Sequence, residues 1–90
     1  MIGKYVTSKA GHDKGKLYVV AACEEGYVYQ VDGEYRRMDD PKKKKLKHVQ
    51  LINEMVEQEL LTQIDNRQPH IDDAIKYAIK KKLKTNKVEE

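Results

Sequence analysis

The residues best suited to bind a ligand form a short loop near the start of the chain, Lys9-Ala10-Gly11-His12-Asp13-Lys14-Gly15-Lys16. Its two glycines allow positive φ angles and let backbone N–H groups approach an anion closely. Its three lysines and one histidine supply positive charge. The loop therefore favours phosphate binding through Lys9, Gly11, His12, Lys14, Gly15 and Lys16, although the same residues are also typical of a solvated turn.

A second group of lysines lies in the middle of the chain, where Lys42 to Lys45 are followed by Leu46 and Lys47. Five lysines within six residues can contact several phosphates at once. Charge runs of this kind also occur on solvated surfaces without a ligand. Asp39 and Asp40, which come just before the run, partly offset its charge.

Arginines and tyrosines between the two basic groups add further candidates. Arg36 and Arg37 suit RNA because guanidinium groups pair with phosphates and stack on bases. As neighbours on a strand they would face opposite sides, and they could instead serve to discourage edge pairing. Tyr27, Tyr29 and Tyr35 could stack on unpaired bases, or could pack across strands.

The positive charge is unevenly distributed along the 90 residues. Residues 1–48 contain eleven Lys or Arg against seven Asp or Glu, a balance of +4. Residues 49–90 contain seven against eight, a balance of −1, which together give the net charge of +3. This segregation indicates a polyanionic partner for the first half.

Enzymatic and metal-dependent functions find no support in the sequence. His12, His48 and His70 are far apart, and Cys23 is the only cysteine, so no pair has zinc-ligand spacing. No nucleophile elbow, phosphate-binding loop or catalytic carboxylate pair is present. We expect no cofactor, a buried and inert Cys23, and a cytoplasmic location without a membrane span.

The first half predicts about five short strands with turn signals between them, which favours a small barrel. Asp32-Gly33 suits a two-residue hairpin turn with a returning strand after it. The expected strands are 4–8, 17–23, 27–31, 34–38 and 46–51.

The second half changes to a helical period. Val56, Leu60 and Ile64 repeat every four residues, with Asn53 as the expected N-cap. A second helix is expected from Ile71, with acidic residues in its first turn and lysines in its last. The predicted organisation is a barrel over 1–52, a helical hairpin over 53–84 and a flexible tail over 85–90, an α+β class.

The first half resembles a KOW motif. Gly3 and Val6 precede the loop glycines Gly11 and Gly15, and the apolar strand from Leu17 to Val20 follows them. The continuation YVYQVDGEYRRMDDPKKKKLKHVQL is similar to that of the eukaryotic- and archaeal-type large-subunit ribosomal proteins of the fourteen/twenty-seven kind. Over residues 1–52 the chain also resembles the short bacterial KOW domain-containing RNA-binding proteins.

That resemblance implies an SH3-like barrel that binds ribosomal or other structured RNA without performing chemistry, with ribosomal proteins as further partners. Within the chain, Lys9, Gly11, Lys14, Gly15 and Lys16 match the motif. A protein-interaction module is the alternative, because SH3-like barrels also bind proteins. The sequence leaves the RNA target and the oligomeric state open.

Overall fold

The protein is an α+β chain in which a five-stranded sheet is followed by two helices, as the sequence predicted. The computed structural model describes residues 1–9, 11 and 14–89, with side chains of the last helix as far as residue 84. The elements in chain order are β1 Lys4–Ser8, β2 Leu17–Glu24, β3 Tyr27–Val31, β4 Lys42–Lys45, the single 3-10 turn η1 Leu46–His48, β5 Val49–Met55, α1 Gln58–Asp65 and α2 Asp72–Glu89.

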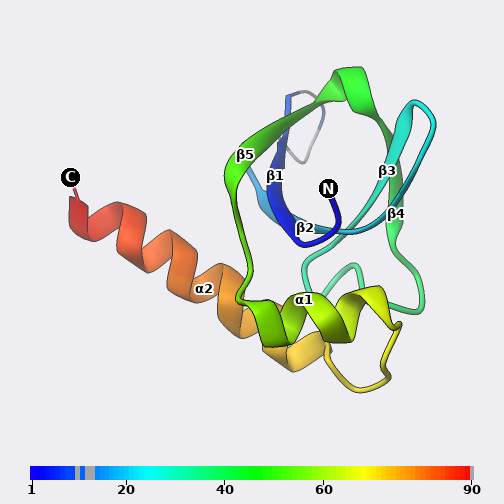
Figure 1. Cartoon of the computed structure of the whole chain (residues 1–90). Coiled ribbons are helices and arrows are strands. Elements are labelled where there is room, and N and C mark those ends of the chain that lie inside the picture. Colours follow the sequence, from blue (N-terminus) through cyan, green and yellow to red (C-terminus); the bar gives the residue numbers. More distant parts are fainter. Residues whose placement is uncertain (10, 12–13, 90) are drawn as a thin grey trace.

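The strands form one antiparallel sheet in the order β4-β3-β2-β1-β5. The register shifts between Val20 and Ala22, where β2 pairs with β3, and between Lys4 and Val6, where β1 pairs with β5. Such irregularities bend a sheet. Figure 1 shows the sheet curled, with β3 and β4 on one side and β1 and β5 on the other. Among the described residues, β4 and β5 make no ladder with each other, so the sheet is open.

The curled sheet has an apolar cluster on each of its faces because alternate residues of its central strands point to opposite sides. Val19 of β2 belongs to the outer cluster, and its neighbour Val20 belongs to the inner one. The inner cluster consists of Val6, Tyr18, Val20, Val28 and Val49. The strand residues of the outer cluster are Tyr5, Leu17, Val19, Ala21 and Val31.

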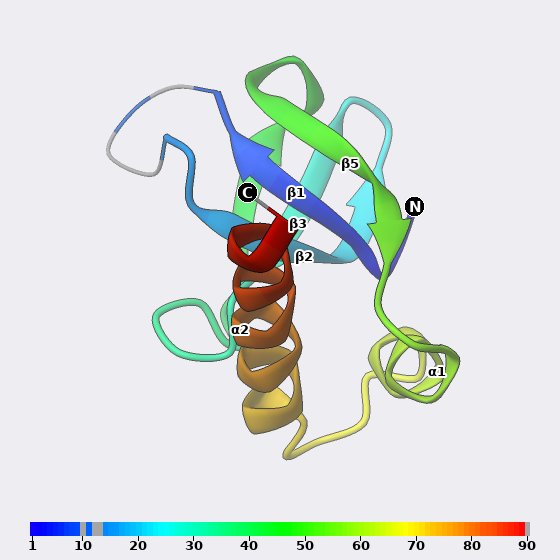
Figure 2. The ribbon, with the colours of Figure 1, turned by 90° about the vertical axis from the view of Figure 1, so that its left-hand side faces the viewer.

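Both helices cover the outer cluster, so they are docked on the sheet (Figure 2). Leu60 and Ile64 of α1 and Ile75 and Ile79 of α2 are buried there, at the helical spacing seen in the sequence. The acidic first turn of α2 is as predicted. Leu83 remains 44% exposed, because α2 continues beyond the sheet toward the C-terminus (Figure 1).

The predicted return strand over 34–38 is wrong. Instead of a two-residue hairpin, Asp32 begins a wider loop that runs to Pro41. Its Oδ1 atom accepts hydrogen bonds from the backbone N–H groups of Glu34 at 2.9 Å and Arg36 at 2.8 Å. This side-chain-to-backbone pattern competes with a strand ladder. The fourth strand is therefore the lysine run itself, β4.

Two other expectations also need correction. β5 runs to Met55, which pairs with Lys4, so α1 has its N-cap at Glu57 and not at Asn53. Cys23 is exposed because the buried part of β2 ends at Ala21. The backbone of α2 is helical to Glu89. No helix in the described part of the chain is long and apolar enough to cross a membrane.

Gly33 fixes how the loop after β3 meets α2. It has a φ of +80°, and an added Cβ atom would overlap the carbonyl oxygen of Asp72 and lie 2.8 Å from the amide nitrogen of Lys76. We expect Gly33→Ala to lower the free energy of unfolding by about 3 kcal/mol, measured by urea denaturation.

Gly26→Ala is the matched control for this substitution. Gly26 has a φ of +79°, and apart from its chain neighbours no described residue lies within 4 Å of the added Cβ atom. Only the cost of the left-handed backbone applies there, about 1–2 kcal/mol. Equal losses in the two variants would show that Gly33 makes no close contact with α2.

Candidate nucleic-acid interface

Three turns meet at one end of the sheet: the β1–β2 loop, the β2–β3 turn and η1 (Figure 1). The backbone N–H of Lys9 donates to the carbonyl of His48 at 2.9 Å. The N–H of Leu46 donates to the carbonyl of Gly26 at 2.9 Å. Hydrogen bonds therefore join η1 to both hairpin turns. As a result, the two basic segments of the sequence lie side by side.

The β1–β2 loop uses its glycines as the sequence indicated. Gly11 and Gly15 each have a φ of +82°. The N–H of Lys14 donates to the carbonyl of Gly11 at 3.2 Å, and the N–H of Gly15 donates to the carbonyl of Ser8 at 3.1 Å. These bonds turn the chain back toward β2. His12, a predicted phosphate ligand, lies outside the described residues.

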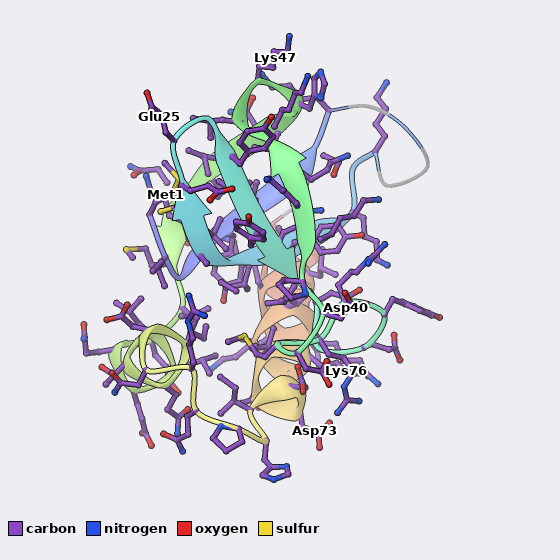
Figure 3. The ribbon with its side chains drawn as sticks, turned by 90° about the vertical axis from the view of Figure 1, so that its right-hand side faces the viewer. Met1, Glu25, Asp40, Lys47, Asp73 and Lys76 are labelled. Carbon is purple, nitrogen blue, oxygen red and sulfur yellow. The ribbon has the colours of Figure 1, made fainter. Side chains whose placement is uncertain are left out.

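Four lysines at this end have exposed side chains, and we call the surface they form the basic end. They are Lys9, Lys14, Lys45 and Lys47. Within the described part of the chain, no acidic side chain pairs with any of the four. Figure 3 shows the side chain of Lys47 projecting away from the sheet. Among the described residues, these lysines would therefore break no ion pair on binding an anion.

The lysine run does not present all its side chains to one surface. Because β4 is a strand, its side chains alternate between the two faces. Lys44 is paired with the buried Val28 of β3, whereas Lys43 is paired with Tyr29. The half-buried members are Lys42 and Lys44, and the exposed members are Lys43 and Lys45.

Lys43 is engaged in a network on the outer face of β3 and β4. Its Nζ atom lies 3.1 Å from Oε1 of Glu24 and 4.4 Å from the ring centroid of Tyr27. The hydroxyl of Tyr29 donates to the same Glu24 oxygen at 2.7 Å. The hydrogen bonds from Tyr29 and Lys43 lower the pKa of Glu24, and Glu24 in turn raises the pKa of Lys43. Lys43 is therefore less available to an external anion than Lys45.

Both arginines and Lys16 also have acidic partners. Lys16 lies 3.2 Å from Oδ2 of Asp32, and Arg37 lies 3.4 Å from Oδ2 of Asp72. Arg36 lies 3.8 Å from Oδ2 of Asp40. The expectation that Arg36 and Arg37 point to opposite faces of a strand is wrong, because they lie in the loop after β3.

Asp32 is a structural residue whose role was not predicted from the sequence. Burial by itself raises the pKa of Asp32, but hydrogen bonds from the backbone of Arg36 and Glu34 and from Lys16 outweigh it and leave the pKa below its ordinary value. The signal in the sequence was ambiguous, because an Asp before a Gly suits both a tight hairpin and a loop held by the Asp side chain.

The comparisons with known proteins do not assign this surface. No protein-family model matches the chain, and no curated protein matches it. In the described ranges, no group of three or more His, Cys, Asp or Glu side chains is placed to hold a metal ion.

The lowered pKa of Asp32 predicts a loss of stability in acid. An unfolded Asp protonates near pH 3.9, and folded Asp32 protonates at lower pH. Its contribution to stability is therefore complete above about pH 4 and is lost as the pH falls through the folded pKa. We expect Asp32→Asn to be less stable than the wild type by about 1 kcal/mol at pH 7.

This difference should shrink below about pH 4, as measured by urea denaturation across a pH series. Asp40→Asn is the control, because the Asp40 side chain is 83% exposed and its carboxylate forms a long pair, at 3.8 Å, with Arg36. A difference for Asp32→Asn that stays constant between about pH 3 and 6 would contradict a lowered pKa.

Proposed function

We propose that this protein binds RNA through the basic end. The observation that carries the proposal is the hydrogen bond from Lys9 to His48, which joins the two basic segments into one surface. Segments far apart in the sequence thus contribute Lys9, Lys14, Lys45 and Lys47 to the same surface. Lysines contact phosphates as point charges, and each contact releases condensed counterions from the nucleic acid.

The proposed contacts are mainly to the phosphate backbone, so sequence specificity is modest. Gly11 and Gly15 leave the loop backbone accessible, since a Cβ atom added at either residue would have no neighbour within 4 Å among the described residues beyond its own chain neighbours. Backbone N–H groups and lysines position a nucleic acid but do not identify its bases. Structured RNA suits such a surface because double-stranded RNA is recognised largely by its shape and its phosphates.

We further propose that the curled sheet is an SH3-like barrel of the KOW type. Its support is the five-strand order and the single turn η1, which brings the open edge strands β4 and β5 together at one end. The proposal extends to the resembled families: a cytoplasmic protein that binds ribosomal or other structured RNA, works beside ribosomal proteins and performs no chemistry.

A protein-interaction role is the second candidate, and one groove favours it. The groove lies between β5, α1 and α2, with Tyr5 and Leu60 among its apolar lining residues. Met55 and Tyr77 also line it and are 46% and 68% exposed. An apolar contact in this groove would depend little on salt, whereas phosphate contacts at the basic end would weaken steeply as salt increases.

The test is a pair of double variants with equal loss of charge. We expect Lys14→Gln with Lys47→Gln to weaken binding to a paired RNA of about 16 base pairs. The slope of log K against log salt should fall by about two units, one for each lost phosphate contact. Fluorescence anisotropy between about 50 and 200 mM salt measures both quantities.

Lys80→Gln with Lys84→Gln is the matched control, because these exposed lysines lie on α2, which runs away from the basic end (Figure 1). The control should leave the slope nearly unchanged. Equal losses from both double variants would mean that net charge, and not the basic end, drives binding. Wild-type binding that does not change with salt would reject the proposed RNA function and favour the groove.

A further inference from the structure

Three tyrosines of the first half could stack on bases, and the structure separates one from the other two. Tyr27 and Tyr29 are half-buried on β3, and the Lys43 ammonium group lies 4.4 Å and 5.8 Å from their ring centroids. Tyr29 also donates its hydroxyl hydrogen to Glu24. Tyr35, in contrast, is 74% exposed, more than any other large hydrophobic side chain in the described part of the chain.

The loop that carries Tyr35 is held firmly on both sides of this residue. Before it, Asp32 accepts the backbone N–H of Glu34, whose side chain lies 2.9 Å from Nζ of Lys76 on α2. After it, Asp72 of α2 accepts the backbone N–H of Met38 at 2.8 Å. Single exposed aromatics are common on protein surfaces. An exposed aromatic ring on a loop that is held by these hydrogen bonds and this ion pair is already positioned for a ligand, which reduces the entropy lost on binding.

One cation contacts the ring of Tyr35, and a second follows it in the sequence. The Nζ atom of Lys16 lies 4.5 Å from the ring centroid of Tyr35. Arg36 is the next residue, and its partner Asp40 is 83% exposed at 3.8 Å, a surface pair of little strength. Lys16 also connects Tyr35 to the β1–β2 loop, and Figures 2 and 3 both show the two loops on the same side of the molecule.

We propose that Tyr35 stacks on an unpaired base of the bound RNA, while Arg36 contacts a phosphate that flanks this base and Lys16, held by Asp32, positions the ring. The inference rests on the proposed RNA function and adds a binding preference to it. The protein then binds RNA with a bulged or looped nucleotide more tightly than fully paired RNA. Stacking tolerates any base because every base has an aromatic face. The preference is therefore for an unpaired nucleotide and not for a sequence.

The test uses two RNA duplexes of equal length, one fully paired and one with a single bulged 2-aminopurine. Wild-type protein and Tyr35→Phe should bind the bulged RNA more tightly and quench the 2-aminopurine fluorescence. Tyr35→Leu should lose on the order of 5- to 100-fold in affinity for the bulged RNA and little for the paired RNA. Its urea midpoint should not change, because the side chain is exposed.

Tyr77→Leu is the matched control, since Tyr77 is also an exposed tyrosine, at 68%, but lies on α2. It should keep both the bulge preference and the quenching. Wild-type protein that binds the two RNAs equally, or a Tyr35→Leu variant that keeps the preference, would overturn the stacking site while RNA binding stands. Failure of the wild type to bind either RNA would overturn both proposals.

Discussion

The burial of β2 on both faces is the constraint on which the rest of the structure depends. Leu17 to Ala21 are all buried, and neighbouring residues of this segment face opposite sides of the sheet. The inner side is closed when the sheet curls over Tyr18 and Val20. The outer side can be closed only by another layer, because exposing it would leave a large apolar patch in water. The helices are therefore part of the fold's core and not an appendage.

This two-layer arrangement also decides where charge can lie. The lysines of the first half cannot enter either apolar cluster without losing hydration, which is costly for an unpaired charge. The turns at one end of the sheet remain in water, and the basic loop and the end of the lysine run are both located there. The hydrogen bonds of η1 to Lys9 and Gly26 then fix the two segments relative to each other. The basic end is thus a consequence of how the hairpins are connected.

The loop after β3, which runs from Asp32 to Pro41, connects the basic end to the helices. The carboxylate of Asp32 accepts hydrogen bonds from two backbone N–H groups and pairs with the ammonium group of Lys16. Gly33 lies against the first turn of α2. A carboxylate that accepts several hydrogen bonds is strongly ordered, and it orders the residues that donate to it. This same loop, which contains Tyr35, Arg36 and Arg37, is therefore held between the β1–β2 loop and α2. Its shape depends on a helix that begins forty residues later in the chain.

The sequence by itself determined the elements whose pattern is local. The strands β1, β2 and β3, the buried period of Leu60 and Ile64, and the acidic start of α2 follow from alternation, helical spacing and end charges. It also identified the basic residues, whose charge is independent of fold. Only the tertiary structure decided which of these cations are engaged. Lys16, Arg37 and Lys43 have partners that are distant in sequence or brought close by strand pairing.

The tertiary structure also decided which residues form the fourth strand and what shape the loop before it takes. Asp32-Gly33 is compatible with a hairpin or with a loop held by the Asp side chain, and the lysine run is compatible with a strand or with a solvated turn. Local preference does not separate these outcomes. The docking of α2 against Gly33 and the pairing of Lys43 with Tyr29 select one outcome in each case, because both contacts form only when the whole chain is folded.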